Sequence, residues 1–188
     1  MPASRSRPRA PREPVRIHVT GNAGAGKTTL AAELGQALGV PVYSLDSIVW
    51  SPGWKKTPPE QRDAAVRKLI DQPCWVIDGV SEAVREASDL ILFLDVPRHV
   101  CAWRGLRRSL RHLTRTRPEM PPDCPEWRIV PRLLQIIRRF PAHAGLAIRR
   151  EAERDPARYR IVRNADEARE WLGRCTTRDS WRRVAELD

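Results

Sequence analysis

Short apolar runs alternate with helical stripes along most of this chain. The run at 15–20 alternates and is rich in β-branched residues, which is typical of a strand. The runs at 74–77 and 90–94 are continuously apolar, as expected for parallel strands that are covered on both faces. The runs predicted to be strands lie at 15–20, 41–45, 74–77, 90–94 and 159–162.

Between these runs, apolar residues recur at helical spacing, as Leu30, Leu34 and Leu38 do. Thr57 or a neighbour is predicted to cap the second helix, and Asn164 the last. The predicted helices cover 28–38, 60–70, 98–113, 127–139, 142–153 and 164–172, and the predicted loops cover 51–59 and 114–125. Alternating β and α units predict an α/β fold, a three-layer domain with a five-stranded parallel sheet.

The junction between the first strand and the first helix carries a complete phosphate-binding loop (P-loop), G-x-x-x-x-G-K-[ST]. Its glycines let the backbone turn N–H groups inward, and the helix N-terminus adds to this cradle for an anion. Lys27 can then reach the β- and γ-phosphates, and the Thr28 hydroxyl can bind Mg²⁺. The residues expected to hold the nucleotide here are Gly21, Asn22, Ala23, Gly24, Ala25, Gly26, Lys27, Thr28 and Thr29.

Length and composition indicate one domain in a reducing cytoplasm. The chain has 188 residues and no apolar run long enough to span a bilayer, so we expect no membrane contact. A monomer or weak dimer is expected. Its four cysteines form no C-x-x-C pair, which favours free thiols. We expect a disordered basic tail at 1–14, a P-loop domain at 15–176 with a mobile lid at about 112–126, and a second tail at 177–188.

A net charge of +11 raises the question of nucleic-acid binding. Residues 98–117 carry seven arginines and no acid. Beside a P-loop, arginines of this kind favour a phosphate clamp over a nucleic-acid patch, and nucleic acid is not an expected partner. A solvated arginine face is the alternative without function.

Three aspartates stand at the ends of apolar runs, where α/β folds place ligands. Asp78 is a candidate Mg²⁺ ligand, with a turn residue as the alternative. Asp46 can orient an acceptor hydroxyl or a metal-bound water, or it can cap a helix. Asp95 is expected to be a structural cap, and His18 a packed strand residue.

The order of these motifs resembles the P-loop small-molecule kinases of the adenylate kinase and shikimate kinase-like fold. Two further stretches are similar to bacterial adenylate kinase-related topology modulation (FlaR-like) proteins: Leu45-Asp46-x-x-x-Trp50, and Arg117-Pro118-Glu119-Met120 followed by Cys124-Pro125-Glu126. The likeness covers about 15–172. It implies that Arg104 packs on adenine, that Arg108 contacts the transferring phosphates, and that Arg115 and Arg117 lie in the lid. The positions that hold AMP in adenylate kinases find no match at 50–80.

The sequence therefore predicts a kinase that transfers the γ-phosphoryl group of Mg-ATP to a small-molecule acceptor. Lys27, Asp46 and Arg108 are the expected catalytic residues, with ATP and Mg²⁺ as cofactors. The acceptor is left open among nucleotides, nucleosides and small alcohols. Trp50 and Trp54 line the acceptor pocket or pack within their loop. The alternative function is a regulatory or nucleic-acid-associated NTPase with little kinase activity.

Overall fold

The computed structural model describes residues 15–112 and 120–174. Five parallel strands form the central sheet in the order β2-β5-β1-β6-β7. Their bounds are β1 Arg16–Gly21, β2 Val42–Ser44, β5 Trp75–Asp78, β6 Leu90–Leu94 and β7 Tyr159–Val162. All five predicted strands are present.

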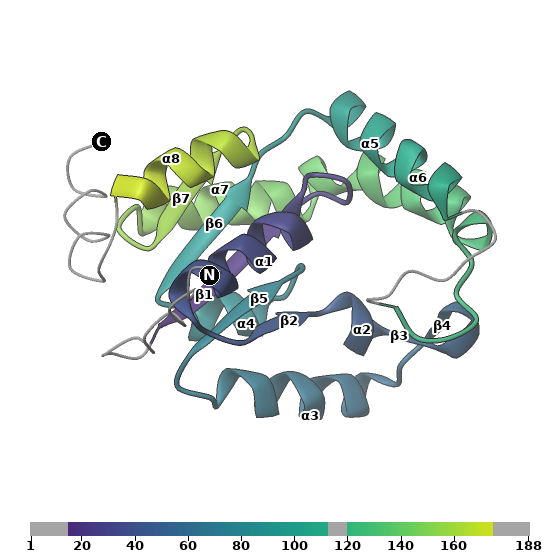
Figure 1. The fold of residues 1–188 in the computed structure, drawn as a ribbon, viewed down its shortest axis with the longest axis horizontal. Helices are drawn as coiled ribbons and strands as arrows, with labels where there is room; N and C mark the ends of the chain where they lie inside the picture. The colour runs from purple at the N-terminus through teal and green to yellow at the C-terminus, as the bar shows by residue number, and fades with distance from the viewer. Residues whose placement is uncertain (1–14, 113–119, 175–188) are drawn as a thin grey trace, which may run out of the picture.

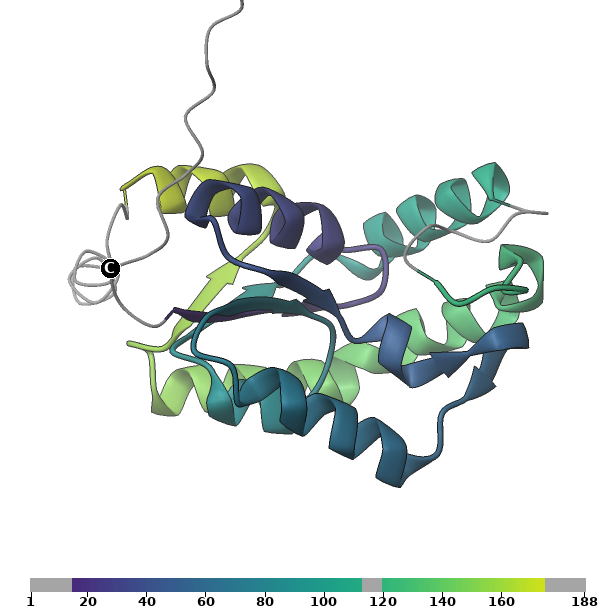
Figure 2. The same cartoon turned by 60° about the horizontal axis from the view of Figure 1, so that its bottom comes forward.

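Helices cover both faces of this sheet, so the domain has three layers. The α-helices are α1 Lys27–Leu38, α2 Asp46–Val49, α3 Pro59–Ile70, α4 Glu82–Ala87, α5 Arg98–Arg111, α6 Val130–Arg139, α7 Ala144–Arg154 and α8 Ala165–Arg174. Figure 2 shows α1 and α8 on one face and α3, α4 and α7 on the other. Helices α5 and α6 pack side by side and extend beyond the sheet (Figure 1). The predicted three-layer α/β fold is confirmed.

Alternate residues of the central strands supply two separate cores, because neighbouring side chains of a strand point to opposite faces. On β5, Val76 belongs to the core beneath α1 and α8, whereas Trp75 and Ile77 belong to the core with α3 and α4. Strands β1, β5 and β6 are almost entirely buried, which explains why two of them read as continuous apolar runs. A third cluster, formed by Trp50, Met120, Cys124 and Ile129, lies outside the sheet.

The predicted loop at 51–59 is wrong in part. Residues 50–56 form a small antiparallel hairpin of β3 Trp50–Ser51 and β4 Lys55–Lys56, joined by the 3₁₀ turn η1 Pro52–Trp54. Gly53 has φ +75°, a backbone conformation that glycine adopts without strain, and this conformation allows the turn. The Thr57 hydroxyl bonds Ser51 at 3.0 Å and caps no helix, because α3 starts without a side-chain cap.

Several helix boundaries also differ. The predicted helix at 127–139 becomes the 3₁₀ turn η2 Glu126–Arg128 followed by α6, because Pro131 lacks an N–H and is accommodated in the first turn of a helix. Another 3₁₀ turn, η3 Phe140–Ala142, precedes α7. Helix α4 lies where no element is predicted, and the Ser81 hydroxyl caps it by accepting from the Val84 N–H at 3.4 Å. The predicted cap of α8 is confirmed, since Asn164 Oδ1 accepts from the Glu167 N–H at 2.8 Å.

Candidate active site

The P-loop runs from the end of β1 into α1 and makes a tight turn that depends on glycine. Gly21, Gly24 and Gly26 all have positive φ, at 148°, 82° and 101°. At Gly24 a side chain is also excluded by space, because a Cβ would lie 2.3 Å from the carbonyl oxygen of Cys101 in α5. The loop therefore packs directly against α5, the helix that carries the candidate arginines.

Asn22 holds the loop from within. Its Oδ1 accepts from the Ala23 N–H at 2.8 Å, and its Nδ2 donates to the Ile137 carbonyl of α6 at 3.0 Å. Asn22 is buried, so these bonds replace contacts with water. Its carbonyl also accepts a hydrogen bond of 2.9 Å from Lys27 Nζ. Asn22 therefore ties the P-loop to both Lys27 and α6.

Lys27 lies in a partly buried position between acidic groups. Burial lowers the pKa of its ammonium, while the charges of Asp46 and Asp78 oppose that change and the charge of Arg108 adds to it. Arg108 is thus close enough to Lys27 for the two cations to interact. A cation that is already poorly solvated gains more from a phosphate anion than an exposed one would.

Asp78 ends β5 beside Thr28 and Ser44. The Ser44 hydroxyl donates to its Oδ1 at 2.7 Å, and its Oδ2 has no hydrogen-bond partner among the described residues. Burial raises the pKa of Asp78. This increase is opposed by the hydroxyls of Thr28 and Ser44 and by the charge of Lys27. A buried carboxylate oxygen without a partner, beside a threonine hydroxyl, fits a site for Mg²⁺.

Asp46 is the first residue of α2 and borders the same cavity. The structure gives α2 no side-chain cap, so the alternative role of Asp46 as a helix cap finds no support. Asp95 is also not a cap. Its carboxylate pairs with Arg149 of α7 through three hydrogen bonds of 2.6, 2.7 and 3.1 Å, which is a structural role.

One cavity of about 850 Å³ brings most of the predicted site residues together. That volume is in the range of small-molecule sites. Its charged lining consists of Lys27, Asp46, Lys56, Asp78, Arg104, Arg108, Glu126 and Arg132. Of the nine predicted loop residues, Asn22 and Ala25 are buried in the loop and do not line it.

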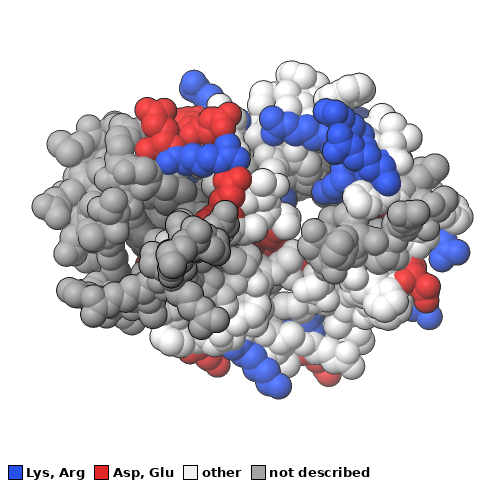
Figure 3. All heavy atoms as spheres, viewed as in Figure 1, with Lys and Arg blue, Asp and Glu red and all other residues white. Residues whose placement is uncertain are grey.

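Arg104 and Arg108 both border this cavity, one helical turn apart on α5. Arg104 is exposed, whereas Arg108 is partly buried. The charge of Arg108 contributes to lowering the pKa of Lys27. Lys and Arg side chains gather at the upper right of Figure 3, where Figure 1 places α5 and α6. The lid candidates Arg115 and Arg117 lie outside the described residues.

The two tryptophans of the hairpin pack against neighbouring groups and also border the cavity. Trp50 is buried, with the Arg132 guanidinium 4.9 Å from its ring centroid and Trp54 at 5.4 Å in an edge-to-face arrangement. The Trp54 indole N–H donates to the Pro125 carbonyl at 2.9 Å. Both rings pack, and both also border the cavity. The hairpin is thereby fixed to the segment that precedes α6.

Two charged residues of the lining, Lys56 and Glu126, were not predicted, and Arg132 is expected from the sequence only as a phosphate-contacting substitute for Arg104 and Arg108. Glu126 is completely buried and accepts a hydrogen bond of 2.7 Å from the Ser109 hydroxyl of α5. Glu126 stands in the stretch that carries the resemblance, but nothing in the spacing marks it as buried.

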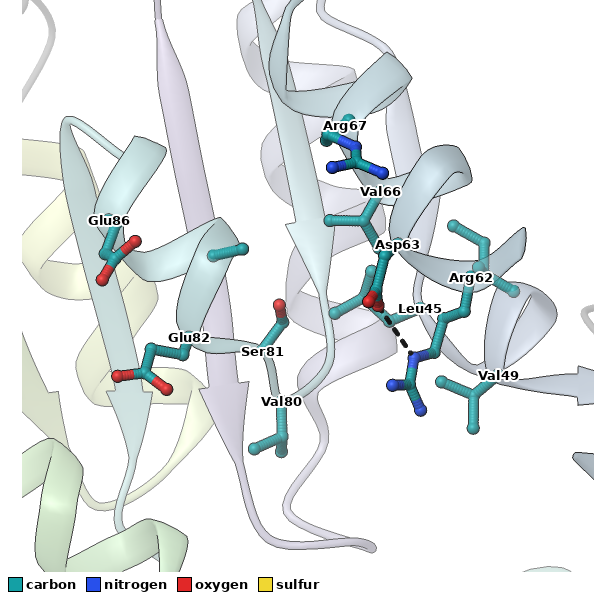
Figure 4. Close-up of a pocket in the computed structure, with 12 residues that line it drawn as sticks. Leu45, Val49, Arg62, Asp63, Val66, Arg67, Val80, Ser81, Glu82 and Glu86 are labelled. Carbon is teal, nitrogen blue, oxygen red and sulfur yellow. Dashed lines mark hydrogen bonds and ion pairs between the residues drawn. The ribbon is translucent and has the colours of Figure 1, made fainter. Parts of the chain in front are cut away.

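A second cavity, of about 730 Å³, adjoins the first and shares Leu45, Val49 and Val80 with it. Figure 4 shows Arg62, Asp63 and Arg67 of α3 on one side, and Glu82 and Glu86 of α4 on the other. Arg62 and Asp63 form an ion pair at 3.4 Å. This cavity therefore offers apolar surface with charges of both signs.

His18 is packed in β1, as predicted. It is buried, and its Nε2–H donates to the Gly79 carbonyl at 3.1 Å.

Cys74, Cys101 and Cys124 are free thiols, and the fourth cysteine lies outside the described residues. Among the described residues no group of three or more His, Cys, Asp or Glu side chains is arranged to hold a metal. No helix in that part of the chain is both long and apolar enough to cross a membrane.

Comparison with known proteins supports the fold. No protein-family model and no curated protein matches the sequence. The chain is similar to TT1252 from Thermus thermophilus, with a TM-score of 0.50 and 18% identity over 88% of this chain and 100% of that one. It also aligns with shikimate kinase from Acinetobacter baumannii in complex with shikimate, at a TM-score of 0.48 and 20% identity, over 93% of this chain and 91% of that one.

Shikimate kinase from Bacteroides thetaiotaomicron aligns at a TM-score of 0.43 and 22% identity, over 92% of this chain and 97% of that one. Of these three likenesses, the one to TT1252 shows a shared fold and no more.

Proposed function

We propose that this chain is a phosphotransferase that moves the γ-phosphoryl group of ATP to a hydroxyl of a small-molecule acceptor. The observation that carries the proposal is the convergence of Lys27, Thr28, Asp46, Asp78, Arg104 and Arg108 on one cavity. Phosphoryl transfer needs positioning and charge stabilisation more than covalent chemistry, and this set supplies both.

The P-loop amides and Lys27 bind the phosphates, and Arg108 stabilises the charge that develops on the transferring group. Thr28 and Asp78 would hold Mg²⁺, which supplies charge neutralisation on the phosphate oxygens when bound. The bond between the γ-phosphorus and its bridging oxygen breaks, and a bond to the acceptor oxygen forms. Asp46 accepts the hydroxyl proton, and ADP leaves with the electron pair of the broken bond.

The acceptor side of the site is formed by the hairpin 50–56 and the cavity of Figure 4. In that cavity the charge of Arg62 is offset by Asp63, and Arg67 faces the acidic side chains of α4 across it. A cavity lined by charges of both signs favours an uncharged acceptor with hydroxyl groups over an acceptor that itself carries a phosphate group. Nucleosides and small alcohols are therefore the first acceptors to test.

An acceptor panel tests the proposal. ADP release is measured with ATP and Mg²⁺ alone and then with nucleoside monophosphates, nucleosides or small alcohols. The proposal predicts that one class raises ADP release at least about tenfold above the rate with water alone. Equal release with every acceptor would mean an NTPase and would reject a kinase.

The basic surface over α5 and α6 favours one other candidate, a nucleic-acid-associated NTPase. Such a protein should bind DNA with an affinity that falls steeply as salt rises, because binding releases counterions. DNA binding that ATP leaves unchanged, together with no acceptor effect, would favour this second function. DNA binding that ATP displaces would place the arginines in the nucleotide site.

A further inference from the structure

Glu126 is a carboxylate with no exposed surface, at the point where the last turn of α5 meets the turn η2. It begins the turn η2, and the Ser109 hydroxyl of α5 donates to its Oε2 at 2.7 Å. Its own N–H donates to the His112 carbonyl at 3.4 Å. Glu126 therefore joins the last turn of α5 to the segment that leads into α6.

Burying a carboxylate is costly unless cations or hydrogen bonds compensate for the lost water. The cavity that Glu126 lines is rich in cations, with Arg104 and Arg108 on the adjoining helix and Arg132 on α6. The other two acids of this lining, Asp46 and Asp78, lie at the Lys27 end. Among the described residues, Glu126 is thus the acid that the α5–α6 side contributes to this lining.

The orientation of α5 decides where its arginines point. Ser109, which bonds Glu126, directly follows Arg108 and lies one turn and a residue beyond Arg104. Nearer its N-terminus, α5 packs on α6. A Cβ on Gly105 would lie 3.4 and 3.5 Å from side-chain atoms of Ile137 and Leu133. A rotation of α5 would move both guanidinium groups along the cavity wall.

We infer that Glu126 is a positioning residue, whose negative charge and bond to Ser109 hold α5 so that Arg108 meets the transferring phosphoryl group. The inference rests on the proposed function. Glu126 touches no substrate and acts through α5. Its charge matters most in the transition state, where the geometry of Arg108 is most demanding.

The test compares Glu126→Gln, which keeps the size and an acceptor for Ser109 but removes the charge, with Ser109→Ala, which removes the bond but keeps the charge. Glu153→Gln on the exposed face of α7 is the matched control. For each variant we measure kcat, KM for ATP, and the ratio of the dissociation constant for ADP to that for ADP with aluminium fluoride, a transition-state analogue.

Glu126→Gln should lower kcat about tenfold or more, with KM for ATP within about threefold of wild type. The analogue ratio should fall by a similar factor. Ser109→Ala should show part of the same loss, because it removes the bond to α5, while Glu153→Gln should change the ratio less than about threefold. If Glu126→Gln does not fold, Glu126→Asp is measured instead. Because it keeps the charge, its analogue ratio should stay close to that of wild type even where its Tm falls. A merely structural role would instead lower Tm and leave kcat and the ratio unchanged.

Two outcomes overturn the inference: Glu126→Gln with wild-type kcat and analogue ratio, or Ser109→Ala with both quantities unchanged from wild type. A wild-type protein that transfers phosphoryl to an acceptor while Glu126→Gln behaves normally rejects only the role of Glu126. A wild-type protein with neither transfer nor tighter binding of the analogue rejects the proposed function as well.

Discussion

The Ser44 hydroxyl and the Asp78 carboxylate are joined by a hydrogen bond of 2.7 Å between the paired ends of β2 and β5. This bond orients the carboxylate through Oδ1 and leaves Oδ2 without a partner among the described residues. The position is next to Thr28, at the Lys27 end of the cavity. It is where a parallel α/β sheet places a ligand, at the carboxyl ends of its strands.

Asp78→Asn should therefore weaken Mg²⁺ binding more than it weakens the fold. We expect the Mg²⁺ concentration for half-maximal activity to rise about tenfold, because an amide oxygen binds Mg²⁺ less well than a carboxylate. Ser44→Ala is the control and should shift it less. Activity that persists in excess EDTA would contradict any role for a divalent ion.

Gly24 gives a prediction about the P-loop that does not depend on the reaction. Gly24→Ala places a methyl group against the Cys101 carbonyl, so we expect it to destabilise the fold by about 2 kcal/mol more than Gly53→Ala. Gly53 has a similar φ, +75°, but no atom within 4 Å of its Cβ position. Urea unfolding of both variants measures the difference, and equal losses would mean that the contact with α5 is not tight.

His18 makes stability depend on pH. Burial, with a smaller contribution from the charge of Arg85, lowers the pKa of His18 from 6.5 to about 3. The unfolded chain takes up a proton below pH 6.5 and the folded chain does not, so the stability that neutral His18 provides is complete above pH 6.5 and is lost as the pH falls toward 3. Between pH 7 and pH 5 the free energy of unfolding should fall by about 2 kcal/mol more in wild type than in His18→Gln. Parallel curves for the two proteins would show that His18 titrates normally.

Arg104 and Arg108 should respond differently to lysine. Arg104→Lys should mainly raise KM for ATP and relax the preference for adenine, because an ammonium group cannot stack as a plate. Arg108→Lys should mainly lower kcat, because a bidentate partner of the transferring group is lost. Steady-state kinetics with ATP and GTP separates the two effects. Unchanged constants in both variants would mean a solvated arginine face.

The sequence predicts the sheet and the P-loop well because both depend on local patterns. The runs at 74–77 and 90–94 are buried on both faces, so their composition alone identifies them. The glycine spacing of the P-loop is likewise a backbone requirement, visible at Gly24 without any knowledge of its neighbours.

The hairpin and Glu126 could not be predicted in the same way, because distant contacts create them. Trp54 bonds a carbonyl 71 positions away, and this contact turns a proline-rich stretch into an ordered part of the cavity. Glu126 becomes significant only through its bond to Ser109 and its complete burial. Tertiary contacts outweigh local propensity at such sites.

Tracing the label from γ-³²P-ATP in wild type and Lys27→Ala distinguishes phosphoryl transfer to an acceptor from hydrolysis and tests the role of the P-loop lysine. With Mg²⁺ and an accepted alcohol or nucleoside, wild type should move the label to the acceptor and form ADP in equal amount. Lys27→Ala should fold normally and transfer less than about 1% as fast, since it lacks the cation on the phosphates, while Lys68→Ala on the exposed face of α3 should match wild type. Label found only in inorganic phosphate, or transfer by Lys27→Ala at the wild-type rate, would contradict a P-loop kinase.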